Sequence, residues 1–129
     1  MKIKFLFTEE YPMWKRGLTE LKEALKDLKI TSRVQLIKVR NLRDAKKYDF
    51  IGSPTIRINE AEIGRDAWKI DETGTEVKEI KPNLTCRIYL FNGKIYEYPP
   101  KGMIKDFIKT YVVWKETDKA SDDEGIVLE

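Results

Sequence analysis

The sequence contains no histidine and only one cysteine, Cys86, among its 129 residues. The absence of histidine excludes the Ser-His and Cys-His pairs of nucleophilic catalysis. A single thiol excludes an intrachain disulfide, and without histidine it does not make up a zinc or copper site. Neither glycine-rich phosphate-binding motif is present. We therefore expect no metal and no cofactor, and the sequence favours a protein that is not an enzyme.

Long apolar runs are also missing. No stretch approaches the ~18 consecutive apolar residues of a membrane span, and no apolar run follows the basic start as in a signal peptide. We therefore expect a cytoplasmic protein without a membrane partner. Glutamine occurs once, at Gln35, whereas Lys and Glu abound, and this usage is typical of thermophile proteins.

Charge is divided unevenly along the chain. Residues 1–115 carry 24 Lys and Arg against 16 Asp and Glu, whereas residues 116–129 carry one lysine and six acidic residues. The length and the apolar content of 41% predict one domain over residues 1–115. We expect residues 116–129 to form a flexible acidic tail.

The hydrophobic periodicity predicts strands that alternate with helices. We expect strands at Lys2–Phe7 and Val34–Arg40, with a helix from Pro12 to about Leu28 between them. Asn41 is expected to cap a short helix whose inward residues are Leu42, Ala45 and Tyr48. Later elements are a strand at Thr55–Ile58, a brief return at Ala61–Ile63, a short strand around Val77 and Ile80, and a final helix from Lys101 to about Lys115.

A β-hairpin is predicted from Cys86 to Tyr98, because Asn92-Gly93 supplies the two positive φ angles of a type I′ turn. A two-residue loop sets Tyr89 opposite Tyr96 and Phe91 opposite Lys94. We expect Cys86, Ile88, Leu90 and Ile95 to share the face of the hairpin that packs on the core. A buried cysteine that acts as a small hydrophobe fits this placement.

The turn Gly52-Ser53-Pro54-Thr55 leads directly into a β-branched strand. The order β-α-β-α-β-β-α, with a proline at the start of the third main strand, resembles the thioredoxin fold, an α/β fold with a mixed central sheet. The resemblance implies a cis peptide bond at Pro54. Together with Cys86-Arg87-Ile88-Tyr89, the turn resembles a family of small thioredoxin-like proteins of unknown function, sometimes associated with mercury or arsenic detoxification. The resemblance covers roughly residues 2–114.

Tyr11-Pro12-Met13-Trp14 falls where redox members of the fold have Cys-Pro-x-Cys, so the resemblance implies the fold without the dithiol. We therefore interpret the protein as a non-redox binding or adaptor module. The fold binds extended peptides against the backbone before its proline. The candidate binding residues, expected at one end of the sheet, are Tyr11, Met13, Trp14, Ser53, Pro54 and Thr55.

Two other functions remain open. Cys86 is the candidate thiol for single-thiol exchange or for soft-metal capture with a partner's thiols. A basic stretch is compatible with contact to nucleic acid, although a solvated surface is the more usual explanation of such a stretch. It consists of Arg33, Lys38, Arg40, Arg43, Lys46 and Lys47.

Overall fold

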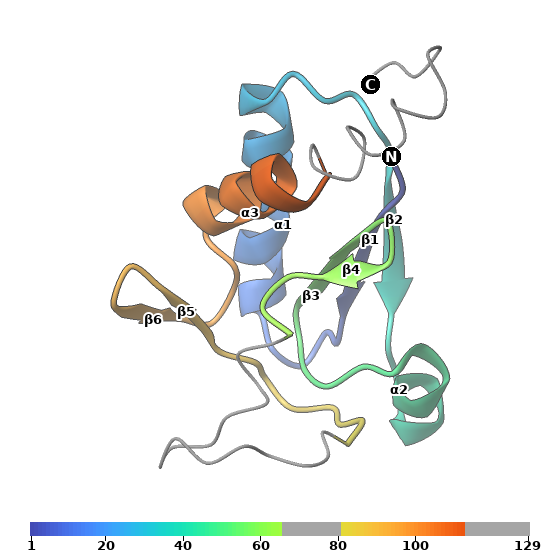
Figure 1. Cartoon of the computed structure of the whole chain (residues 1–129). Helices are drawn as coiled ribbons and strands as arrows, with labels where there is room; N and C mark the ends of the chain where they lie inside the picture. The colour runs from blue at the N-terminus through green and yellow to red at the C-terminus, as the bar shows by residue number, and fades with distance from the viewer. Residues whose placement is uncertain (66–80, 113–129) are drawn as a thin grey trace.

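Strand β1, Ile3–Phe7, is central in a mixed sheet (Figure 1). The computed structural model describes residues 1–65 and 81–112. In this sheet β1 pairs in parallel with β2, Val34–Lys38, and antiparallel with β3, Thr55–Ile58. The short strand β4, Ala61–Glu62, pairs with β3, and the four strands lie in the order β2-β1-β3-β4.

Three α-helices accompany the sheet in the described part of the chain. Helix α1, Met13–Asp27, connects the parallel strands β1 and β2. Helix α2, Leu42–Tyr48, begins at Asn41, whose side-chain oxygen accepts a hydrogen bond from the Asp44 N–H at 2.8 Å. Helix α3, Lys101–Phe107, continues into a π-helical segment, Ile108–Val112. No helix in the described ranges is long and apolar enough to cross a membrane.

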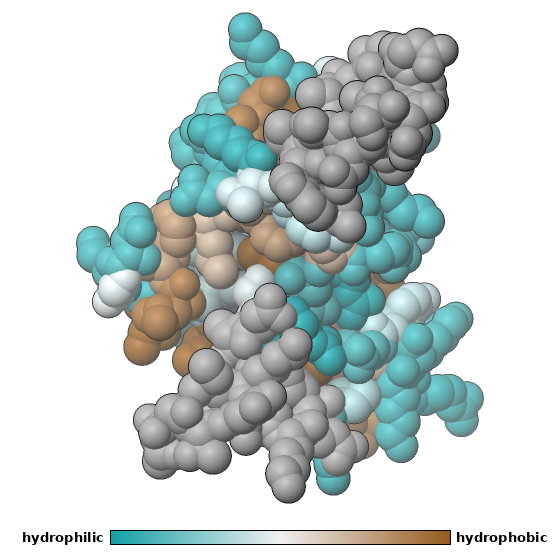
Figure 2. Space-filling model, viewed as in Figure 1, coloured by the Kyte–Doolittle hydropathy of each residue, from teal (hydrophilic) through white to brown (hydrophobic). Residues whose placement is uncertain are grey.

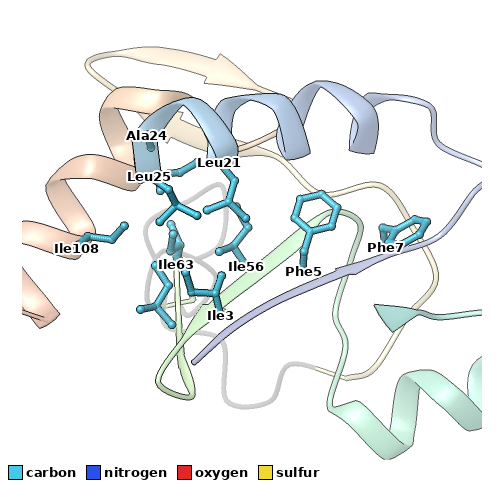
Figure 3. Close-up of a cluster of buried hydrophobic side chains, with 11 residues drawn as sticks. Ile3, Phe5, Phe7, Leu21, Ala24, Leu25, Ile56, Ile63 and Ile108 are labelled. Atoms are coloured by element: carbon cyan, nitrogen blue, oxygen red, sulfur yellow. The ribbon is translucent and has the colours of Figure 1, made fainter. Parts of the chain in front are cut away.

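The main core lies between one face of the sheet and the helices α1 and α3. Figure 3 shows side chains of β1, β3, α1 and the π-helical segment after α3 gathered there. Leu6 of β1 points to the opposite face and packs with Ile37, Val39, Ala45 and Phe50. Apolar residues on both faces of β1 therefore place this strand inside the sheet, as its sequence predicts.

The predicted hairpin forms, but it lies outside the main sheet. Strands β5, Tyr89–Phe91, and β6, Lys94–Tyr96, make a separate two-stranded sheet. The register confirms the prediction, with Tyr89 opposite Tyr96 and Phe91 opposite Lys94. The strands are shorter than expected. The fourth strand of the main sheet is the brief return after β3.

Other expectations were wrong in detail. Strand β2 ends at Lys38, and Leu36 is 53% exposed on this strand, which is outermost in the sheet that the described residues form. Leu42 is also 53% exposed, at the first position of α2, so only Ala45 of the expected inward set is fully buried. The strand expected around Val77 and the acidic tail lie outside the described residues.

The burial pattern predicts opposite outcomes for two leucines. Leu21 is fully buried in the main core, so Leu21→Ala should lower the free energy of unfolding by about 3 kcal/mol through lost burial and the cavity that remains. Leu42→Ala should change it by less than about 0.5 kcal/mol. Urea denaturation measures both. Equal losses would contradict the placement of Leu42 on the surface.

Candidate functional site

The proline turn joins three parts of the chain at the start of β3. The Ser53 side-chain oxygen accepts a hydrogen bond from the Thr8 N–H at 3.0 Å, which ties the turn to the end of β1. The Ser53 N–H donates to the Thr85 carbonyl at 2.9 Å, and its carbonyl accepts from the Arg87 N–H at 3.0 Å. Ser53 therefore forms a parallel bridge with Cys86.

This bridge changes the expected peptide-binding edge. Both backbone hydrogen-bonding groups of Ser53 are engaged by the chain's own segment around Cys86. A third backbone hydrogen bond joins the same two segments, because the Asn83 N–H donates to the Phe50 carbonyl at 2.8 Å. A backbone group that already has a partner offers little to an added strand. The backbone before Pro54 is therefore covered by the protein itself.

The start of α1 packs against the turn. The Trp14 ring stacks on Phe7 with a centroid distance of 4.3 Å and is partly buried against the core. A Cβ added at Gly17 would lie 3.0 Å from Pro54 Cγ, so helix and proline are in close contact. Tyr11, just before this helix, and Met13, its first residue, are both half-buried.

The candidate binding residues thus differ in accessibility. The three from the turn, Ser53, Pro54 and Thr55, are all buried. Trp14 packs against the core, and Trp14, Tyr11 and Met13 each keep part of their surface exposed. These three side chains are the partly accessible members of the set.

Arg87 is the residue that the sequence analysis missed. Its side chain is fully buried, and its Nη1 donates to Glu62 Oε2 at 2.9 Å and to Thr55 Oγ1 at 3.1 Å. Nη2 donates to the Ile63 carbonyl at 3.0 Å. The guanidinium also lies 4.8 Å from the centroid of the Tyr89 ring. One side chain therefore connects the segment before β5 to β3 and to the residues around β4.

Glu62 gathers further cations around this buried arginine. Its carboxylate accepts from Arg57 Nε at 3.0 Å and from Arg65 Nη1 at 3.3 Å. Arg65 also pairs with Asp49 at 3.1 Å. Because a buried charge is costly unless it is paired, the network fixes the position of the Arg87 backbone. That backbone passes so close to Gly52 that a Cβ there would lie 2.7 Å from Arg87 Cβ.

Tyr89 adds a second anchor. Its hydroxyl donates to the Pro54 carbonyl at 2.5 Å. Burial raises the pKa of Tyr89 to about 12, with a smaller contribution from Glu62, while the Arg87 charge acts in the opposite direction. The neutral phenol is therefore the form that this interior favours.

These anchors decide which face of the hairpin is exposed. Alternate strand residues point to opposite sides, so burying Arg87 and Tyr89 turns the neighbouring residues outward. The expected burial was wrong for all of them, since Cys86 is exposed and Ile88, Leu90 and Ile95 are 51%, 64% and 68% exposed. Figure 2 shows this patch in brown at the left of the molecule, where Figure 1 has β5 and β6.

The basic stretch lies along β2 and α2 and is largely exposed. Two of its members have acidic partners, with Lys38 at 2.9 Å from Glu9 and Arg40 at 3.3 Å from Asp44. Within the described residues, no group of three acidic or thiol side chains gathers as a metal site would require. Neither observation adds support for a nucleic acid or a metal at this surface.

A family model described as "Domain of unknown function (DUF2703)" matches residues 14–108. The chain belongs to the DUF2703 family. The DUF2703 match includes the proline turn, Arg87 and the hairpin. It confirms the expectation of a family whose function is unknown, and it assigns no activity. No curated protein and no solved structure matches the sequence.

The buried network makes Arg87 a test of the whole arrangement. Arg87→Met keeps most of the volume but removes the partner of Glu62, Thr55 and the Ile63 carbonyl, so it should lower the free energy of unfolding by about 3–5 kcal/mol. Arg33→Met, at an exposed position, serves as the control and should change it by less than about 0.5 kcal/mol. Urea denaturation measures both, and a similar stability of the two variants would refute the network.

Tyr89 should make stability depend on alkaline pH. Its pKa is near 10 in the unfolded chain and about 12 in the folded protein. The folded state therefore holds the proton more tightly, and this contribution is complete below pH 10 and is lost as the pH rises towards 12. The stability advantage of the natural protein over Tyr89→Phe should shrink by about 2 kcal/mol between pH 9 and 12. Denaturation at several pH values measures this difference. A constant advantage would contradict the burial of the phenol.

Proposed function

We propose that this protein is a thioredoxin-like binding module that lacks the dithiol and recognises a partner protein through the exposed face of its hairpin. The observation that carries the proposal is the apolar patch formed by Ile88, Leu90 and Ile95. Leu90 and Ile95 are direct cross-strand partners, so the patch is continuous. Contiguous apolar surface on a protein is a common mark of a protein–protein contact.

The order of the sheet supports the thioredoxin-like part of the proposal. A parallel β1–β2 pair, an antiparallel β3 beside β1, and a proline turn before β3 correspond to the order that the resemblance implies. Tyr11-Pro12-Met13-Trp14 precedes and opens α1 without a thiol, so disulfide exchange by a dithiol has no residues to perform it. The cytoplasmic location and the flexible tail remain predictions from the sequence.

The binding surface in this proposal differs from the one expected from sequence. The Ser53 backbone has internal partners on both sides, whereas the outer face of the hairpin is open. Anchors on the other face, Arg87 and Tyr89, hold the strands so that the patch needs little ordering when a partner binds. Surfaces that are already ordered lose less conformational entropy on association.

Site-specific photo-crosslinking tests this function. A photoreactive amino acid is placed at Leu90 or Ile95, and at the equally apolar, 53% exposed Leu42 as a matched control. In extract from the source cells, we expect the same discrete adduct from both hairpin positions and none from the control. Excess natural protein should compete for the adduct, and excess Leu90→Asp protein should not.

Two outcomes would overturn the proposal. One is adduct formation at Leu42 as strong as at the hairpin positions, which indicates indiscriminate contact. The other is the absence of a discrete adduct at both hairpin positions while Tyr11 or Met13, carrying the same group, captures a partner. That result would place the binding surface at Tyr11 and Met13, at the start of α1.

The exposed thiol favours one alternative function, exchange through Cys86. In that reaction the Cys86 thiolate attacks a partner's disulfide, forms a mixed disulfide and releases the partner's second sulfur as a thiolate. Replacing Cys86 with serine separates the two functions. The non-covalent proposal expects unchanged crosslinking from Leu90 in this variant, whereas thiol exchange requires its loss.

A further inference from the structure

Helix α1 separates its charges onto two flanks. On one flank, Glu20 accepts a hydrogen bond from the Lys101 N–H at 3.1 Å, and Asp27 pairs with Lys101 at 3.3 Å and with Lys105 at 3.2 Å. The Lys105 and Lys101 hydrogen bonds hold the pKa of Asp27 below its usual value. The acidic side of α1 is therefore turned towards α3 and neutralised there.

The other flank of α1 carries lysines that have no acidic partner among residues 1–65 and 81–112. Lys22, Lys26 and Lys29 are all exposed, and none forms an ion pair with the part of the chain that the structure describes. They line a groove of about 600 Å³ between α1 and β2. Leu25, Ile30 and Leu36 contribute to its apolar floor, and no acidic side chain of the described ranges lines it.

The groove also runs beside an open strand edge. In the described sheet β2 is outermost, with β1 on one side only. Its outer backbone groups are available to an added strand. Leu36 presents its side chain at this edge and is 53% exposed. The apolar floor of the groove, the lysines on its rim and the backbone edge of β2 therefore lie side by side.

We propose that this groove binds an extended, acidic segment of another protein as an added strand on β2. The spacing fits such a segment. Lys22 and Lys26 are separated by about 6 Å along the helix axis, and alternate side chains of a strand are about 6.6 Å apart. Two acidic residues at alternate positions therefore reach two successive lysines, and apolar residues beside them cover the floor.

An extended peptide suits the groove better than nucleic acid does. A nucleic acid is bound through phosphates along a polar, basic surface, often with aromatic side chains for its bases. Here aliphatic side chains line the groove together with the lysines, and no aromatic residue lines it in the described part of the chain. The proposal is independent of the hairpin function, because the two surfaces share no residue.

The test uses the full chain and a fluorescein-labelled peptide, Thr-Ile-Thr-Glu-Thr-Glu-Thr-Ile-Thr, whose inward pattern is the same in both directions. Fluorescence polarisation should show saturable binding that weakens with salt. Replacing both glutamates of the peptide by glutamine should weaken binding about tenfold, and replacing them by lysine should abolish it.

Two pairs of matched variants locate the peptide. Lys22→Glu with Lys26→Glu should abolish binding, as the lysine-substituted peptide does, whereas Arg43→Glu with Lys46→Glu, the same charge change on exposed α2 positions, should leave it unchanged. Leu36→Ser should weaken binding several-fold, whereas Leu42→Ser should not. Circular dichroism checks that each variant is folded.

Four results would overturn the proposal. Equal losses from the two charge-reversed variants indicate unspecific attraction, and a neutral Leu36→Ser indicates that the floor takes no part. If single-stranded oligonucleotide displaces the peptide at similar concentration, the surface is a general anion binder. Unchanged peptide affinity together with self-association of the Lys22→Glu, Lys26→Glu variant assigns the lysines to protection of the strand edge.

Discussion

The burial of one guanidinium group, that of Arg87, determines which surfaces of this molecule are exposed. Arg87 can be buried because Glu62, Thr55 and the Ile63 carbonyl accept hydrogen bonds from both of its terminal nitrogens. A cation in an apolar interior without such partners would be strongly destabilising. Once Arg87 points inward, strand alternation leaves no freedom for its neighbours. The same contact that anchors the hairpin also exposes the thiol and the aliphatic residues on its other face.

The segment that carries Arg87 also covers the backbone of the proline turn. The Arg87 N–H bonds to the Ser53 carbonyl, so the segment that delivers the side chain to Glu62 lies along the turn. Gly52 permits this approach because it has no Cβ. Covering the turn and exposing the hairpin are therefore two consequences of one arrangement. A function that needs the Ser53 backbone open would require breaking the buried pair first, which costs several kcal/mol.

Local rules predicted much of the fold. The Asn41 cap, the strand Thr55–Ile58 and the hairpin register all depend on residues within a few positions of each other, and the structure has each of them. The hairpin face was wrong because periodicity assigns an arginine to solvent and an isoleucine to the core. The partner that reverses this assignment, Glu62, is 25 residues away in another element. Leu42 was placed inward by spacing alone, although the first position of a seven-residue helix at the sheet margin has little to pack against.

The same contrast between local and distant partners applies to α1. Its sequence mixes Lys and Glu at close spacing, which resembles a uniformly solvated surface. The third helix separates these charges, because Lys101 and Lys105 neutralise the acidic flank from outside α1. The lysines on the far flank form no ion pair with the part of the chain that the structure describes, and they line a groove with an apolar floor. The composition of α1 alone does not reveal this separation of charge. The buried pair around Arg87 and the ion pairs between α1 and α3 act alike in this respect. On the hairpin, the charge of Arg87 is paired on the inner side and an apolar surface is left on the outer side. On α1, the acidic flank is paired with α3 and a cationic surface is left on the opposite flank.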